Sequence, residues 1–150
     1  MSGQEPKKLK KLTPKKTEPE NGSSNAVRVL YVEDAEVIRD TIARLLELNG
    51  YEVTYAKNGQ EGVEKAVSWQ PDVILMDLRM PVMDGFKAIE QIKSDPRTRF
   101  IPVFVVSAWS SKKDRTQAKI AGATDFFVKP PDLNQLIAAI ENVLGSRGRG

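Results

Sequence analysis

The chain has 150 residues, of which 40% are hydrophobic, so it is long enough for one domain with a buried core. It contains no cysteine and no histidine, which excludes disulfides, thiolate or imidazole metal ligands, and Cys-His or Ser-His catalysis. The net charge of +3 lies in residues 1–25, which hold six Lys and three Glu, whereas residues 26–150 hold 17 basic and 17 acidic side chains.

Residues 1–25 are predicted to be a disordered basic tail, because they contain no aromatic residue and too few apolar ones to form a core. Residues 26–145 are expected to form the folded domain, and residues 146–150 a short flexible tail. The tail lysines can contact nucleic acid or an anionic membrane, although such charge blocks are more commonly only solvated. No apolar run reaches the roughly 18 residues of a membrane span, and no signal-peptide pattern is present. We therefore expect a soluble, cytoplasmic protein.

From residue 26 onward, short apolar runs alternate with segments in which apolar residues recur every three to four positions. The apolar runs predict five strands, at 27–32, 52–56, 73–76, 103–106 and 125–128. A helical pattern follows each run, and in the first pattern the apolar residues are Val37, Ile38, Ile42, Leu45 and Leu46. The fourth expected helix, at about 112–121, is polar, and the last begins at Asp132, a favoured N-cap residue.

A strand-helix unit repeated five times is typical of an α/β protein with a parallel sheet. The first, third and fourth strands are continuously apolar, as expected for strands with helices over both faces. The strand at 52–56 is more polar and suits an edge of the sheet. Because parallel crossovers are right-handed, this pattern predicts a three-layer αβα sandwich.

Three carboxylates follow two of the buried strands. Glu33 and Asp34 come directly after the first strand, and Asp77 comes directly after the third. In open α/β sheets, ligands bind at the carboxyl ends of the strands, so these side chains can converge at one edge. Clustered carboxylates repel one another, and a hard cation such as Mg²⁺ is the simplest compensation because it prefers oxygen ligands. The alternative for Asp34 alone is a helix cap, since a helical stretch follows it.

Two further polar residues end strands on the same side of the expected sheet. Ser107 ends the fourth strand, and Lys129 follows the fifth. A hydroxyl and an ammonium group at this edge suit an anionic ligand. Lys129 precedes Pro130 and Pro131, which restrict the backbone, so it is less ordinary than a solvated lysine.

Together these residues resemble the receiver domain of two-component response regulators, in particular the single-domain regulators of chemotaxis type. The resemblance covers about residues 26–145. The matching segments are Glu33-Asp34, Asn58-Gly59, Met76-Asp77 through Asp84-Gly85, Ser107-Ala108, Gly122-Ala123 and Lys129-Pro130. The resemblance implies a flavodoxin-like (βα)5 fold with the strand order 2-1-3-4-5.

The resemblance also implies a phosphorylation site. Asp77 would accept a phosphoryl group from a phosphohistidine on a partner histidine kinase or histidine phosphotransferase, and the lack of histidine in this chain is consistent with that role. Mg²⁺ would be held by Glu33, Asp34, Asp77 and the backbone carbonyl of Arg79. Lys129 would pair with a phosphoryl oxygen.

Signalling would follow from a change of shape, so the chain is not expected to be a turnover enzyme on an external substrate. By resemblance, Ser107 would hydrogen-bond the phosphoryl group and Phe126 would change rotamer; the alternative for Phe126 is ordinary core packing. A downstream protein would bind the surface of the fourth helix, the fifth strand and the last helix, and phosphorylation-dependent dimerisation is left open. Arg79 and Trp109 match variable positions that tune phosphoryl lifetime. Only six residues follow Leu144, so no output domain is expected. The chain would then act by binding, as a stand-alone regulator, a phosphorelay intermediate or a receiver cut from a larger hybrid kinase.

Two other classes of function are compatible with parts of the sequence. A Mg²⁺-dependent phosphatase with an Asp nucleophile generally needs a second acid two residues later, where this chain has Arg79. A nucleic-acid-binding protein acting through the Lys-rich tail would need a basic folded face or aromatic platforms. The folded part is neutral, so at most weak nucleic-acid binding through the tail is expected.

Overall fold

The fold is built on a five-stranded parallel sheet. The computed structural model describes residues 25–145, so the predicted tails fall outside the described residues, apart from Asn25. The strands are β1 (Arg28–Val32), β2 (Glu52–Ala56), β3 (Val73–Met76), β4 (Val103–Ser107) and β5 (Asp125–Val128). Their order is β2-β1-β3-β4-β5, and every pairing is parallel. The predicted strand order is therefore confirmed.

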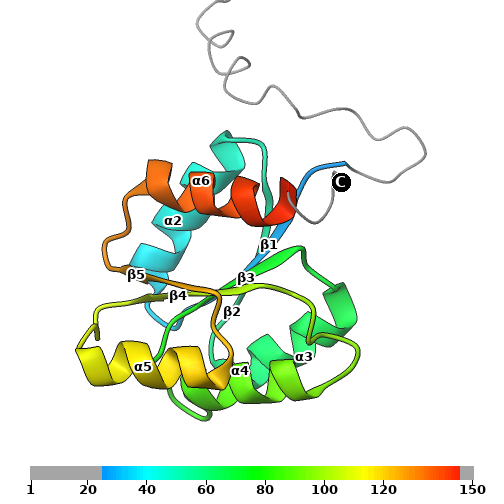
Figure 1. Ribbon diagram of the computed structural model, residues 1–150. Coiled ribbons are helices and arrows are strands. Elements are labelled where there is room, and N and C mark those ends of the chain that lie inside the picture. The colour runs from blue at the N-terminus through cyan, green and yellow to red at the C-terminus, as the bar shows by residue number, and fades with distance from the viewer. Residues whose placement is uncertain (1–24, 146–150) are drawn as a thin grey trace, which may run out of the picture.

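Helices cover both faces of this sheet (Figure 1). Within the described residues they are α2 (Glu36–Leu48), α3 (Gly59–Trp69), α4 (Gly85–Ser94), α5 (Lys112–Ala121) and α6 (Leu133–Leu144). In Figure 1, α2 and α6 lie above the sheet, and α3, α4 and α5 lie below it. The predicted three-layer αβα sandwich is confirmed. None of the helices between residues 25 and 145 is long and apolar enough to cross a membrane.

The burial of each strand follows its place in the sheet. Every residue of β3 and β4 is buried, and so is every residue of β1 after Arg28. Helices cover both faces of these strands, so both faces must be apolar. The edge strand β2 buries only Ala56, which accounts for its more polar sequence.

The two faces of the sheet have separate hydrophobic cores. Alternation along β1 places Leu30 in the core under α3, α4 and α5, and Tyr31 in the core under α2 and α6. Alternation along β5 likewise packs Phe126 against the first core and Phe127 against the second. Phe127 lies against Phe104, with 5.8 Å between ring centroids.

Side-chain caps set the start of most helices. The N-cap residues of α3, α4, α5 and α6 each accept a hydrogen bond from a backbone N–H of the first turn, and they are Asn58, Asp84, Ser111 and Asp132. The N-cap of α2 is Ala35, which offers no such bond. Asp34 therefore does not cap α2, and its carboxylate remains available to the site described below.

The buried side of α2 differs from the apolar pattern of its sequence. Val37 belongs to that pattern but is 81% exposed. The buried residues are Arg39, Ile42, Ala43 and Leu46, at helical spacing. A charged residue thus occupies the first position of the buried stripe, close to where β1 ends.

Candidate functional site

The three acidic side chains meet at the carboxyl end of the sheet. Glu33 and Asp34 follow β1 and Asp77 follows β3, and these two strands are hydrogen-bonded neighbours. One carboxylate oxygen from each residue lies within 4.8 Å of those of the other two. Glu33 and Asp77 are buried, whereas Asp34 is exposed. The cluster therefore consists of two buried carboxylates and one that is open to solvent.

Lys129 supplies a positive charge from the opposite part of the sheet edge. Its Nζ lies 2.5 Å from Oε1 of Glu33 and 3.5 Å from Oδ2 of Asp77. Its backbone N–H donates to the carbonyl of Ser107, and its bond to Pro130 is cis. The ammonium group is thus shared by two buried carboxylates, which offsets part of their mutual repulsion.

Asp77 is oriented by the chain that follows it. Its Oδ1 accepts a hydrogen bond of 2.9 Å from the backbone N–H of Leu78, which leaves Oδ2 toward Lys129. Burial, and then the charge of Glu33, raise the pKa of Asp77 to about 6, although Lys129 and the Leu78 N–H act in the opposite direction. A carboxyl group with this pKa is mostly ionised at neutral pH, as a nucleophile requires.

The Asp84-Gly85 pair brings the start of helix α4 against the backbone of Asp77 and Leu78. Asp84 caps the helix by accepting from the N–H of Lys87 at 2.9 Å. Gly85 donates its own N–H to the carbonyl of Leu78 at 2.9 Å. A Cβ at position 85 would overlap the carbonyl oxygen of Asp77, so only glycine permits this approach.

Ser107 ends β4, and Phe126 lies on the adjacent strand β5. The Ser107 side chain is fully buried, and its Oγ accepts a 3.1 Å hydrogen bond from the N–H of Trp109. Phe126 is half-buried, and the guanidinium carbon of Arg115 lies 4.7 Å from its ring centroid. Phe126 therefore contacts both the hydrophobic core and the side chain of Arg115. This position is compatible with a rotamer switch and with ordinary core packing.

The mouth of the site carries a cation–π pair. The guanidinium carbon of Arg79 lies 4.0 Å from the ring centroid of the half-exposed Trp109. Val82, in the same loop as Arg79, has φ of 67°, a left-handed conformation that β-branched residues rarely adopt. The loop after β3 is thus strained beside the acidic cluster.

The donor set fits a hard divalent cation. All the candidate ligands are oxygens, two of the three carboxylates are fixed by neighbouring groups, and the third is open to solvent. Mg²⁺ commonly binds through one or two carboxylates and retains several waters, which the exposed side of Asp34 allows. A soft metal would find neither sulfur nor imidazole in this chain.

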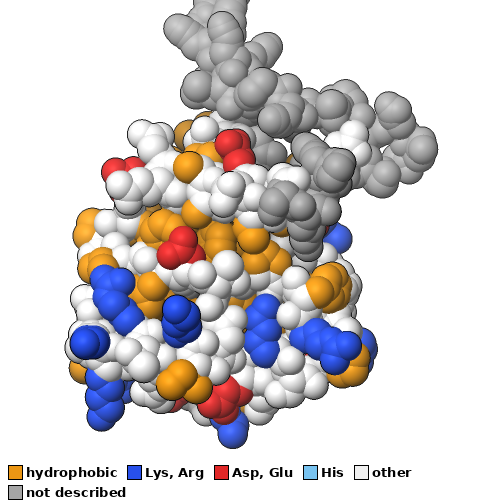
Figure 2. All heavy atoms as spheres, in the orientation of Figure 1, with side chains coloured by type: hydrophobic (Ala, Val, Ile, Leu, Met, Phe, Trp, Pro, Cys, Tyr) orange, Lys and Arg blue, Asp and Glu red, His pale blue; other side chains and the backbone are white. Residues whose placement is uncertain are grey.

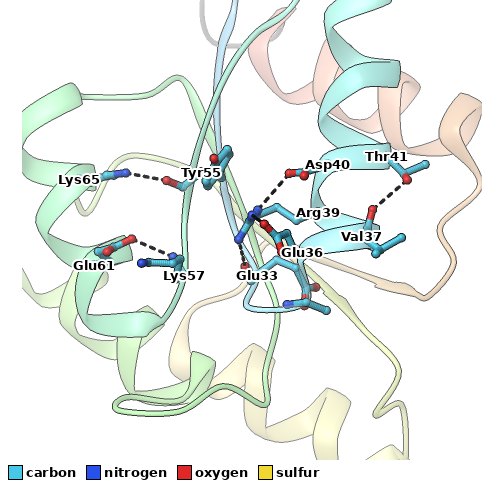
Figure 3. Close-up of polar contacts among 11 residues, drawn as sticks. Glu33, Glu36, Val37, Arg39, Asp40, Thr41, Tyr55, Lys57, Glu61 and Lys65 are labelled. Carbon is cyan, nitrogen blue, oxygen red and sulfur yellow. Dashed lines mark hydrogen bonds and ion pairs between the residues drawn. The ribbon is translucent and has the colours of Figure 1, made fainter.

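Two neighbours of the site were missed from the sequence. Arg39 touches the Glu33 carbonyl from α2, as Figure 3 shows. Its position on the stripe of Ile42, Ala43 and Leu46 is the signal that could have revealed it. Tyr31 lies in the core below, where burial and then the charges of Glu33 and Asp77 raise its pKa. Nothing in its apolar run distinguishes it.

Comparison with known proteins places the chain in one family. Residues 29–141 match the family described as the response regulator receiver domain. The chain therefore belongs to the response regulator receiver domains, which are phosphoaccepting signalling switches. The predicted family and the predicted class of function are confirmed.

The curated relatives include proteins of different lengths. Protein PilH of Pseudomonas aeruginosa is 38% identical over 117 residues, which span 78% of this chain and 97% of that protein. The dual master transcriptional regulator RpaA of Synechocystis is 36% identical over 117 residues, again 78% of this chain but only 48% of the relative. The chain thus spans nearly all of one relative and about half of the other.

Solved structures show the same fold. The chemotaxis protein CheY4 of Vibrio cholerae has a TM-score of 0.74 at 33% identity, over 79% of this chain and 99% of that chain. The receiver domain of the sensor histidine kinase PA1611 of Pseudomonas aeruginosa has a TM-score of 0.75 at 32% identity, over 80% and 98%. The latter structure has a magnesium ion coordinated in its active-site cleft.

Proposed function

We propose that this chain acts in the cytoplasm, where Asp77 accepts a phosphoryl group from a phosphohistidine on a sensor histidine kinase or histidine phosphotransferase, with Mg²⁺ bound beside it. The observation that carries this proposal is the convergence of Glu33, Asp34 and Asp77, with Lys129 joined to two of them. These groups supply a nucleophile, a cation site and a fixed positive charge within one pocket.

The transfer step follows from the geometry of Asp77. A carboxylate oxygen of Asp77 attacks phosphorus while the phosphorus–nitrogen bond of the donor breaks, and the departing imidazole keeps that bond's electron pair. No general base is needed, because a carboxyl group with a pKa of about 6 is already ionised near neutral pH. Lys129 stabilises charge on a phosphoryl oxygen from its position beside Oδ2.

Glu33, Asp34, Asp77 and the backbone carbonyl of Arg79 would hold the cation. When bound, Mg²⁺ neutralises charge on the phosphoryl oxygens during transfer. In this proposal, Glu33 is kept in place by Lys129 and by the Ala35 N–H, which donates to its Oε2 at 3.0 Å. The exposed Asp34 contributes a ligand that can reach the ion without displacing a buried partner.

The switch would run through Ser107 and Phe126. The Ser107 hydroxyl would donate to a phosphoryl oxygen and give up the hydrogen bond that it now accepts from Trp109. Movement of Ser107 opens space next to Phe126, which would then turn inward and leave its contact with Arg115. Added charge at Asp77 would thereby change the surface of α5 and β5.

The changed surface is the proposed partner site. A hollow of about 620 Å³ lies along β5 and the start of α6, lined in part by Phe127, Val128 and Pro131. Figure 2 shows hydrophobic side chains in the band between α6 and α5, with Lys and Arg side chains below them. A downstream protein, or a second phosphorylated copy of this chain, would bind there.

Trp109 offers a direct test, because its backbone N–H donates to the Ser107 hydroxyl that is proposed to move. The chain has two tryptophans, and Trp69 lies at the far end of α3, so Trp69→Phe leaves Trp109 as the only indole. Acetyl phosphate added to the chain already saturated with Mg²⁺ should change its fluorescence further and reversibly. EDTA or Asp77→Asn should abolish the change, and a response that survives Asp77→Asn would exclude Asp77 as the acceptor.

A further inference from the structure

Arg39 is a buried cation that the proposed phosphoryl transfer does not use. Only 4% of the residue is exposed, although it is the fourth residue of a surface helix. Arginine is almost never buried this far without partners that compensate the loss of hydration. Its partners therefore show what it does.

The carboxylates near Arg39 are weak partners. Glu36 lies 3.8 Å and Asp40 lies 3.4 Å from the guanidinium, and their side chains are 78% and 59% exposed. Ion pairs with such exposed partners contribute little, because solvent screens them. These contacts alone do not account for the burial of Arg39.

Arg39 also stacks on an aromatic ring. The guanidinium carbon lies 4.0 Å from the ring centroid of Tyr55, on the edge strand β2 (Figure 3). Lys65 fixes the same residue from α3 by donating to the Tyr55 carbonyl at 2.7 Å. An arginine stacked on an aromatic face is held in one orientation, and part of its desolvation cost is offset.

One N–H of the guanidinium reaches the start of the acidic loop. Nη1 of Arg39 donates to the backbone carbonyl of Glu33 over a long 3.5 Å. The backbone N–H of Glu33 donates to the Ala56 carbonyl at 3.0 Å, one residue beyond Tyr55. Arg39 thus links α2, the end of β2 and the first residue after β1.

The Glu33 carbonyl lies at the start of the segment that carries two carboxylates of the cluster. Glu33 and Asp34 follow β1 directly, and the N-cap of the next helix, Ala35, provides no side-chain cap. Within residues 25–145, no other side chain donates to the Glu33 carbonyl. We propose that Arg39, stacked on Tyr55, is a positioning residue for the divalent-cation site. This inference rests on the proposed function.

The direction in which Mg²⁺ affinity changes when Arg39 is removed distinguishes a positioning role from a purely electrostatic one. A positive group close to the acidic cluster repels a divalent cation, so by charge alone its removal should tighten Mg²⁺ binding. If Arg39 positions the loop, its removal should weaken binding. Loss of an outer partner of a metal ligand typically reduces metal affinity by about 10-fold to 100-fold.

The test is a Mg²⁺ titration of the full chain carrying Trp69→Phe, in the absence of any phosphodonor. Trp109 fluorescence is the readout of binding. Arg39→Met should raise the Mg²⁺ Kd by about tenfold. Arg39→Lys, which keeps a cation over Tyr55, should recover part of that loss, and Tyr55→Leu should weaken binding as well. Arg44→Met removes the same charge from an exposed position of α2 and should leave the Kd unchanged.

An unchanged or lower Kd in Arg39→Met, with a native circular dichroism spectrum, overturns the inference and leaves the proposed function intact. If Arg39→Met does not fold, Tyr55→Leu and Arg39→Lys decide in the same way. If the parent chain itself shows no saturable Mg²⁺ binding, both this inference and the proposed function are overturned.

Discussion

Asp77 carries its charge where the surrounding residues disfavour it. Burial and the neighbouring Glu33 raise the pKa of its carboxyl group from 3.8 to about 6, while Lys129 limits the rise. The cost of keeping this group ionised is what a bound cation or a new phosphoryl linkage can relieve. The reactive residue is therefore also a source of instability in the metal-free protein.

This cost has a defined pH dependence. Because the folded-state pKa is raised, the folded state binds more protons than the unfolded state between about pH 4 and pH 6. In EDTA, the contribution of Asp77 to the free energy of unfolding should fall as the pH rises through this interval, then level off. A rise in pKa from 3.8 to about 6 corresponds to about 3 kcal/mol.

Urea denaturation between pH 4 and pH 8 measures this effect. Asp77→Asn should lose that part of the slope and be more stable than the parent chain at pH 7. Identical slopes for the two proteins would show that Asp77 titrates as an ordinary surface carboxylate.

Val82 is strained in the loop after Asp77. Its φ is 67° and it is 79% exposed, so it has an unfavourable backbone conformation with little burial in return. Val82→Asn should raise the free energy of unfolding by about 1 kcal/mol, because asparagine tolerates the left-handed region. Val37→Asn is the control, since Val37 is equally exposed but lies in a helix. A denaturation midpoint that does not rise for Val82→Asn contradicts the strain.

Helix α5 depends more on its cap than its neighbours do. It buries only Asp114 and Ala118, and it begins with a capping box in which Ser111 and Asp114 bond reciprocally. Ser111→Ala should lower the free energy of unfolding by about 1 kcal/mol and speed amide exchange in α5. Ser110→Ala, one residue earlier, removes a hydroxyl with no such role. Equal exchange rates in the two variants would show that packing alone maintains the helix.

The elements of this fold were predictable because their signals are local. The run 73–76 is continuously apolar and became a buried central strand, and Asp132 was recognisable as an N-cap. The sequence alone did not settle the role of Asp34, because an aspartate directly before a helix can be either a helix cap or a metal ligand. The N-cap is Ala35, so the Asp34 side chain does not cap α2.

Across the whole molecule, the convergence of the acidic residues was predictable from the sequence. The residues that surround and position them were not. Residues that end parallel strands share one edge of a sheet, so Glu33 and Asp77 were expected to be close. The contact of Arg39 with Tyr55 joins residues from different elements, and an arginine in an amphipathic helix is ordinarily solvated. The pKa of Asp77 likewise depends on three-dimensional burial.

The charge of the molecule is also divided unevenly. All of the net positive charge belongs to residues 1–25, and the family match begins only at residue 29. Removal of residues 1–24 should therefore leave the Mg²⁺ Kd and phosphoryl uptake unchanged, as measured by Trp109 fluorescence. A variant with the six tail lysines changed to Gln is the control for charge. A marked loss of uptake in either protein would mean that the tail takes part in the site.

Intact-mass measurement of the chain after incubation with acetyl phosphate and Mg²⁺ tests the assignment of Asp77 most directly. We predict the addition of one phosphoryl group, mapped to Asp77, and no addition in Asp77→Asn or in EDTA. Phosphoryl incorporation that persists in Asp77→Asn, or that needs no divalent metal, would contradict the account.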